Sequence, residues 1–173
     1  YTTKTEYNYA GQAVKEYRAD GACVTAEYDK LGRQTAATDY MGNRTEYTYD
    51  KLGRLIKTQT PFEGTEKTES ISYYDGNGNV IRSRQKNNQP GETATYTETE
   101  NEYDSRNRLI CVKVNDGNRN IYTQYTYDGV GNMTMMVSGQ TEKISDLGGT
   151  LPEGVTVMRY EYDRFGNVTK ETD

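Results

Sequence analysis

Short runs in which apolar and polar residues alternate follow one another along the chain, with turn residues between them. Three of these runs place two tyrosine rings two residues apart: Tyr47-Thr48-Tyr49, Tyr125-Thr126-Tyr127 and Tyr160-Glu161-Tyr162. A period of two residues puts both rings on one face of a β-strand. No segment joins a helix-capping box to apolar residues at helical spacing. The pattern therefore predicts an all-β chain.

The turn residues repeat one pattern, Tyr-Asp-x-x-Gly-[Asn/Arg]-apolar. Six copies begin at a Tyr-Asp pair, and a shortened copy runs from Asp39 to Asn43. Asn107 replaces the glycine once, while Gln34 and Arg44 replace the apolar residue. The residues that we predict to carry the structural repeat are Tyr28, Asp29, Gly32, Tyr49, Asp50, Gly53, Tyr74, Asp75, Gly78, Tyr103, Asp104, Tyr127, Asp128, Gly131, Tyr162, Asp163 and Gly166.

Each copy of the pattern has the chemistry of a tight hairpin turn. Aspartate at the first position and glycine at the fourth are preferred in type I turns, and the aspartate side chain accepts hydrogen bonds from backbone amides ahead of it. The glycine supplies the positive φ of the bulge that closes the hairpin. Asn107 fits the same position because asparagine tolerates a left-handed backbone.

The spacing of the copies predicts the architecture. Looser turn residues lie between the later copies, at Pro61 to Gly64, Asn87 to Gly91, Asn115 to Asn120 and Gly148 to Gly154. Each full repeat is then a strand, a tight turn, a second strand and a looser turn at the opposite edge. We expect a long antiparallel meander of repeated β-hairpins, with about a dozen strands in a curved or spiralling sheet. Residues 1–173 form one segment, with clear repeats from about residue 20.

Composition changes this picture in one respect, because the apolar content is aromatic more than aliphatic. The 173 residues include 17 Tyr, but Leu, Ile, Val and Phe together number only 24. Such a chain has little conventional core. We expect tyrosines stacked in ladders along the sheet to compensate, since each cross-strand pair contributes about 0.2–1 kcal/mol.

Charge and residue usage exclude several function classes. The absence of histidine excludes Ser-His-Asp catalysis and His-ligated metals, and the net charge of -5 argues against nucleic-acid binding. No apolar run approaches the roughly 20 residues of a membrane span. Cys23 and Cys111 are interpreted as buried free thiols. The loops that begin at Asp75 and Asp116 lack the Gly and Glu of a calcium loop, so we interpret them as turns. We predict no catalytic residue, no cofactor and no metal.

The repeated pattern resembles the hallmark of the YD-repeat, or rearrangement-hotspot (Rhs), family, Tyr-Asp-x-x-Gly-[Arg/Asn]-[Leu/Val/Met]. The segment Tyr49-Asp50-Lys51-Leu52-Gly53-Arg54-Leu55 is its best match, and the resemblance covers about residues 20–173. We interpret Tyr7-Asn8-Tyr9-Ala10-Gly11 as a degraded earlier copy.

This resemblance implies a β-sheet that spirals into a hollow shell within a large secreted or surface-exposed protein. Such shells enclose a C-terminal toxic domain in Rhs toxins and insecticidal toxin complexes, and they support adhesion modules in teneurins. Bacterial members often end the shell with a self-cleaving aspartyl site that bears an Asp-Pro pair, and this sequence has no such pair. The chain is therefore expected to be an internal shell segment, a fragment of a larger protein.

Two functions follow from these expectations. The first is a non-catalytic structural role, in a secreted or cell-surface protein, with neighbouring repeats and an enclosed C-terminal effector domain of the same parent chain as partners. The alternative is a carbohydrate-binding or adhesion module, in which exposed tyrosines stack on the rings of a surface carbohydrate. The same rings, stacked on each other, would instead stabilise the repeat. The candidate stacking residues are Tyr47, Tyr49, Tyr125, Tyr127, Tyr160 and Tyr162.

Overall fold

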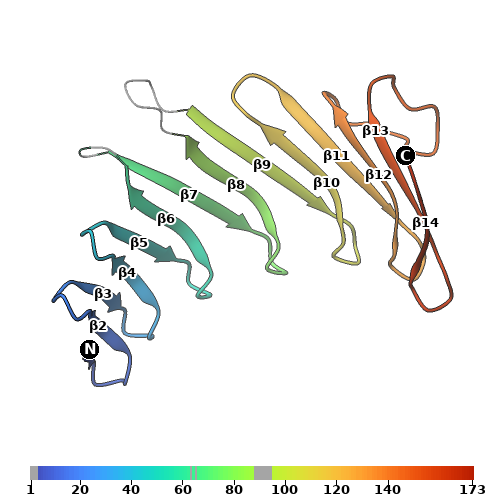
Figure 1. Ribbon diagram of the computed structural model, residues 1–173. Helices are drawn as coiled ribbons and strands as arrows, with labels where there is room; N and C mark the ends of the chain where they lie inside the picture. The colour runs from blue at the N-terminus through green and yellow to red at the C-terminus, as the bar shows by residue number, and fades with distance from the viewer. Residues whose placement is uncertain (1–3, 63, 65, 88–94) are drawn as a thin grey trace. The chain divides into compact units, whose positions relative to one another are not determined.

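The computed structural model describes residues 4–62, 64, 66–87 and 95–173. These residues form fourteen strands, which follow one another in the sheet in the order of the sequence (Figure 1). The prediction of an all-β antiparallel meander is confirmed. The strands are β1 (Lys4–Tyr7), β2 (Ala13–Tyr17), β3 (Cys23–Tyr28), β4 (Gln34–Thr38), β5 (Arg44–Tyr49), β6 (Leu55–Pro61), β7 (Lys67–Tyr74), β8 (Val80–Asn87), β9 (Thr95–Tyr103), β10 (Leu109–Asn115), β11 (Asn120–Tyr127), β12 (Met133–Gln140), β13 (Thr156–Tyr162) and β14 (Val168–Thr172).

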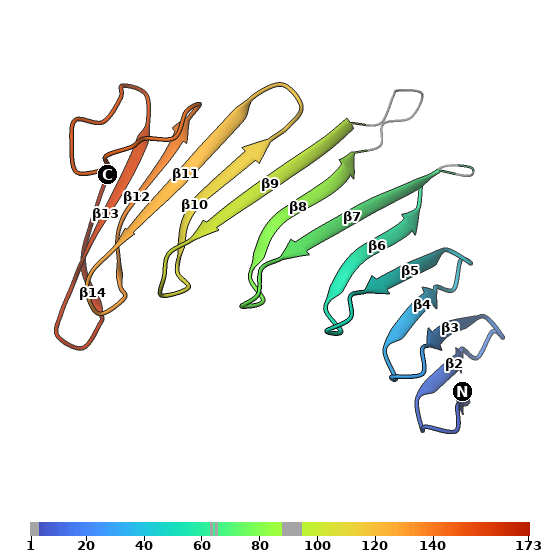
Figure 2. The ribbon, with the colours of Figure 1, turned by 180° about the vertical axis from the view of Figure 1, so that it is seen from behind.

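The contacts within the chain divide it into two compact units. The first unit comprises Tyr1–Ser72 and Arg84–Thr95, and the second comprises Tyr73–Ser83 and Tyr96–Asp173. In the first unit β1 to β7 form six successive antiparallel pairs, from β1–β2 to β6–β7. In the second unit the same holds from β9 to β14, and Figure 2 shows these hairpins from behind. Among the described residues there is no helix that could cross a membrane.

The tight turns have one backbone geometry. At Asp50, its N–H donates to the carbonyl of Arg54 at 2.9 Å, and the N–H of Gly53 donates to the carbonyl of Asp50 at 3.1 Å. Gly53 has a φ of 84°, and Asn107, at the same place in its own copy, has a φ of 68°. This is a type I turn closed by a left-handed bulge residue. The degraded copy at Asn8 makes the same two backbone bonds, so it forms the same turn.

A second bulge follows most of these turns, which the sequence did not predict; the hairpin β4–β5, at the Asp39 turn, has no register shift. Thr48 pairs with Lys57 and Tyr49 pairs with Leu55, so Ile56 has no partner across the hairpin. The register shifts at the corresponding place in the hairpins β1–β2, β3–β4, β9–β10, β11–β12 and β13–β14. Bulges increase the local right-handed twist of a strand pair. The turn ends of these six hairpins are therefore expected to twist in the same way.

The looser turns connect the other ends of the strands. Those predicted at 61–64 and 115–120 lie between β6 and β7 and between β10 and β11, and the one at 148–154 belongs to the connection between β12 and β13. The turn predicted at 87–91 falls largely on residues 88–94, which lie outside the described residues.

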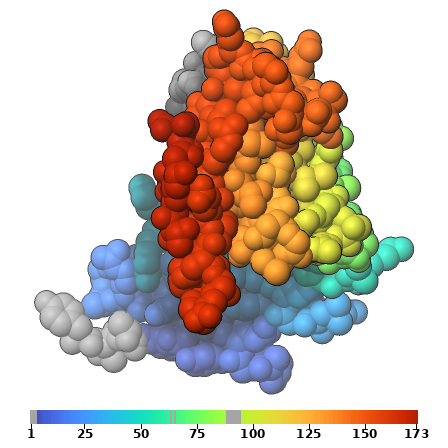
Figure 3. All heavy atoms as spheres, turned by 90° about the vertical axis from the view of Figure 1, so that its right-hand side faces the viewer, coloured from blue at the N-terminus to red at the C-terminus, as the bar shows by residue number. Residues whose placement is uncertain are grey.

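The best-buried side chains of the second unit lie opposite Gln124 on the neighbouring strands β10 and β12. Gln124 itself binds the connection between β12 and β13, residues 141–155, here called the cover loop, which lies in the orange part of the chain in Figure 3. Val137 is 0% exposed and Cys111 is 2% exposed. The side-chain amide of Gln124 donates to the carbonyl of Ile144 at 2.9 Å and accepts from the N–H of Ile144 at 2.7 Å. This paired bond fastens the cover loop to β11.

Candidate functional site

The repeated aspartate organises its turn through both carboxylate oxygens. Oδ1 of Asp50 accepts hydrogen bonds from the backbone N–H groups of Leu52 and Arg54, at 2.8 and 2.9 Å, and Oδ2 accepts from Nε of Arg54 at 2.7 Å. The hydrogen bond from the Arg54 backbone is the main cause that lowers the pKa of Asp50, and the Arg54 side chain lowers it further. The aspartate is therefore a structural group that binds its turn in the ionised form.

The position after the glycine of the pattern accepts either Arg or Asn for the same reason. Nδ2 of Asn79 donates to Oδ2 of Asp75 at 2.8 Å, and Nε of Arg108 donates to Oδ2 of Asp104 at 2.7 Å. Both side chains present an N–H group within reach of the second carboxylate oxygen. This shared N–H donor explains why some copies of the pattern carry Arg and others carry Asn at this position.

We expect this network to make the protein sensitive to acid. Hydrogen bonding lowers the pKa of Asp50 in the folded state below the value of about 3.9 for an unfolded chain. A lowered folded-state pKa contributes stability above the unfolded value, and that stability is lost as the pH falls through the folded value. The free energy of unfolding, measured by urea titration from pH 7 to pH 3, should therefore decrease below about pH 4.

Asp50→Asn is the matched control for this acid effect, because Asn8 already forms the same turn with an amide and accepts from the N–H groups of Ala10 and Gln12. The variant removes one titrating group and keeps the acceptor. Its stability should decrease less between pH 5 and pH 3 than that of the parent chain. An unchanged pH dependence would show that the turn carboxylate does not contribute.

The tyrosine before the aspartate joins its hairpin to the preceding one. The hydroxyl of Tyr127 donates to the carbonyl of Leu109 at 2.7 Å, and the hydroxyl of Tyr49 donates to the carbonyl of Gln34 at 2.8 Å. The acceptor is always the residue that follows the Asn/Arg position of the earlier copy. Tyr28, Tyr103 and Tyr162 make the same bond, to Ala13, Val80 and Met133. Phenylalanine has no hydroxyl and could not make it.

An arginine from the preceding turn covers the same tyrosine. The Arg108 guanidinium donates to the carbonyl of Asp128 at 3.1 Å and lies 4.6 Å from the ring centre of Tyr127. Arg33 makes the equivalent contacts in the first unit: its guanidinium donates to the carbonyl of Asp50 and lies 4.8 Å from the ring centre of Tyr49. These are cation–π distances. Each such tyrosine is held by its neighbour at the hydroxyl and on one ring face.

Removing the hydroxyl alone should weaken the protein. Tyr127→Phe keeps the ring and loses the bond to Leu109, so we expect it to lower the free energy of unfolding by about 0.5–1.5 kcal/mol in urea. Tyr160→Phe is the control, because the Tyr160 hydroxyl makes no hydrogen bond within the described part of the chain. Equal effects of the two substitutions would contradict the role of the hydroxyl.

The remaining candidate stacking tyrosines do not oppose one another across the strands. Tyr47 pairs with Thr58, Tyr125 with Met136 and Tyr160 with Glu171. Across these hairpins none of the three therefore lies directly opposite another tyrosine, and the stacking of tyrosines in ladders along the sheet stays a prediction. All six candidates are half-buried. Stacking of a sugar ring on any of them remains a prediction.

The alternating glutamates of β9 form ion pairs with residues of other elements. Glu98 forms an ion pair with Arg82 at 2.6 Å and Glu100 with Lys113 at 3.0 Å, while Glu102 pairs with Lys143 of the cover loop. The partners come from other strands or loops, so no local pattern could have revealed them.

The cysteines and acidic loops hold no metal-ligand cluster within the described residues. Cys111 is buried, and this burial raises the pKa of its thiol, but Cys23 is only half-buried. The prediction of two buried free thiols is therefore right for Cys111 alone. Asp75 and Asp116 accept hydrogen bonds from backbone amides of their own loops, which confirms that these loops are turns.

Comparisons with known proteins identify the repeat. Residues 28–65 match the family described as RHS Repeat. The structure of TcdB2-TccC3-Cdc42 superposes with a TM-score of 0.56 at 18% identity, over 94% of this chain and 10% of that chain. TcdB2-TccC3 without its hypervariable C-terminal region gives 0.56 at 19%, over 95% and 10%, and TcdB2-TccC3 itself gives 0.55 at 14%, over 96% and 11%.

At these identities the likeness establishes a shared fold, and this chain spans about a tenth of the length of those chains. The matched segment includes the turns at Asp29 and Asp50 and the hydrogen bond of Tyr49 to Gln34, so the family match falls on the repeated structure described above. The family resemblance seen in the sequence is confirmed: the chain carries an RHS repeat, within an antiparallel sheet of the fold found in TcdB2-TccC3.

Proposed function

We propose that this chain is a non-catalytic structural segment of a larger secreted or cell-surface protein, in which the sheet forms part of a β-shell around a toxin or effector domain. The hydrogen bonds between repeats support this proposal most directly. The aspartate, the Arg/Asn and the tyrosine of the pattern each bind within the turn or to the adjacent hairpin. Their chemistry is used to build a continuous wall.

The shared fold supports the same conclusion. Nearly the whole chain superposes on about a tenth of TcdB2-TccC3, a protein whose hypervariable C-terminal region was absent from one of the solved structures. A wall made of many such segments, with a variable region beyond it, fits a protein that holds different effectors in one container. A non-catalytic sheet would suit this passive role.

The test uses the native parent protein, recovered from its source cells and from the culture medium. Intact mass and a peptide map should show a large chain with many more repeats and a distinct C-terminal domain that is cleaved but retained. Added protease should leave that domain intact until urea unfolds the repeats. A parent with no further repeats, or a C-terminal domain digested while the repeats are folded, would contradict enclosure.

A further inference from the structure

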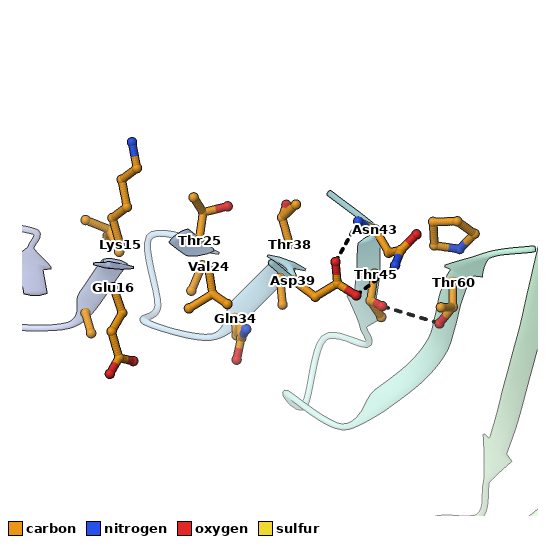
Figure 4. A pocket seen from close by; sticks show the side chains of 15 residues that line it. Lys15, Glu16, Val24, Thr25, Gln34, Thr38, Asp39, Asn43, Thr45 and Thr60 are labelled. Carbon is orange, nitrogen blue, oxygen red and sulfur yellow. Dashed lines mark hydrogen bonds between the residues drawn. The ribbon is translucent and has the colours of Figure 1, made fainter. Parts of the chain in front are cut away.

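A groove of about 540 Å³ crosses the first unit over strands β2 to β6 (Figure 4). Its lining is mostly small or short side chains, among them Ala26, Ala37 and Thr45. Glu16 and Val24 point to one side of the strands, and Lys15 points to the other side. Two of its lining residues, Ala13 and Gln34, also provide the carbonyl groups that accept hydrogen bonds from Tyr28 and Tyr49.

The groove lies at a repeat that has no ring in one place where others do. Ala26 stands three residues before the turn aspartate, where three copies carry Tyr47, Tyr125 and Tyr160 and two others carry Ser72 and Asn101. Ala26 pairs across the hairpin with Ala37, and Ala37 pairs with Thr45 on the next strand. Three adjacent strands therefore place small side chains in one row. This row offers a flat, mainly apolar surface on which an aromatic ring can lie.

Negative charge borders this apolar row. Glu16 pairs across the strands with Val24 and makes no ion pair within the described part of the chain. Asp39 also lines the groove, and its carboxylate accepts hydrogen bonds from the Asn43 side chain at 2.8 Å and from the Asn43 backbone. These bonds lower the pKa of Asp39, so it is ionised at neutral pH. A ligand with a positive charge would complement both groups.

We propose that this groove binds a small aromatic molecule that carries a primary amine. Its ring occupies the place of the missing tyrosine, against Ala26 and Ala37, and its ammonium group lies at the acidic border beside Glu16. The volume is within the usual range of small-molecule sites, about 300–1,000 Å³. The shell proposed above does not require such a site, and the site does not require a shell.

Titration of the full chain with phenylethylamine, followed by NMR of the alanine and valine methyl groups, tests the proposal. We expect saturable shifts at Ala26, Ala37 and Val24. Phenylethanol has the same side group without the charge, and it should bind about two- to fivefold more weakly, which is the range of an exposed ion pair. The absence of saturable shifts would overturn the proposal, and equal binding of the two probes would overturn the role of the acidic border.

Two tyrosine substitutions locate the site. Ala26→Tyr fills the groove with the ring that other repeats carry, so the protein should keep its fold and lose saturable binding. Ser72→Tyr adds the same ring at the corresponding place of the copy at Asp75, and Ser72 does not line the groove. That variant should bind phenylethylamine as the parent does. Ala37→Leu adds a larger side chain to the groove from β4. It provides a second test of binding if the Ala26→Tyr variant does not fold. Binding retained after the groove is blocked would overturn the assignment.

Glu16→Gln tests the ammonium contact separately. The substitution removes the charge, keeps the shape, and should abolish the preference for phenylethylamine over phenylethanol while the ring still binds. Lys30→Gln, which changes a charge on an exposed turn residue that does not line the groove, should leave the preference in place. A preference that persists in Glu16→Gln would show that Glu16 does not receive the amine.

Discussion

Gly53→Val should destabilise the protein by about 1–2 kcal/mol or more, measured by urea unfolding followed by circular dichroism. Gly53 has a φ of 84°, in the left-handed region that a β-branched side chain avoids. A Cβ at this position would meet no atom closer than the Arg33 guanidinium at 3.9 Å. The cost should therefore come from the backbone conformation and not from crowding.

The chain itself supplies the control for this experiment. Asn107 holds the same turn position in its own copy with a φ of 68°. Gly53→Asn should therefore be clearly less destabilising than Gly53→Val, because asparagine visits the left-handed region more readily. Equal losses for the two variants would mean that any side chain at this position is harmful and that the φ argument is wrong.

Gln124→Ala should have the largest effect of any polar substitution in the second unit, about 2–4 kcal/mol in urea unfolding. Gln124 is 5% exposed, and its amide makes both hydrogen bonds to the backbone of Ile144. Alanine would leave the N–H and the carbonyl of Ile144 without these partners. It would also remove the paired bond that fastens the cover loop to β11.

Gln59→Ala is the comparison for this loss. Gln59 also lies in a strand, but its amide makes one bond, to Glu69 at 3.2 Å. We expect an effect below about 1 kcal/mol, as for an ordinary single hydrogen bond. Trypsin provides a second readout, because Lys143 lies in the cover loop beside Ile144 and should be cleaved faster in Gln124→Ala. Unchanged cleavage would show that Gln124 does not hold the loop in place.

Local sequence chemistry was sufficient to predict the hairpins. Aspartate, glycine and the paired tyrosines act within five or six residues of one another, so their spacing carries the turn type, the strand direction and even the exception at Asn107. The degraded copy at Asn8 was recognised for the same reason. The second bulge was missed because residue type does not mark it: Ile56, Ile110 and Thr134 occupy the same unpaired place.

The contacts that join one repeat to the next required the structure. The acceptor of the Tyr127 hydroxyl is a backbone carbonyl 18 residues earlier, and a carbonyl leaves no trace in the sequence. The cover loop was predicted only as a loose turn, since the bond between Gln124 and Ile144 spans 20 residues and depends on how the loop folds back. The groove beside Ala26 likewise became visible only when strand register showed that Ala37 lies opposite.

The neighbour-only pattern of the hairpins has a consequence for how such a chain evolves and folds. In each unit the described strand pairings join segments that are adjacent along the chain, so the folding free energy approximates a sum of hairpin terms and nearest-neighbour couplings, as in a one-dimensional Ising chain. Folding can start at any hairpin and spread from it, with low contact order. When recombination deletes or duplicates one whole repeat, the strands that meet at the junction can form the same kind of nearest-neighbour contacts as before. The array can therefore change its length without losing cooperativity.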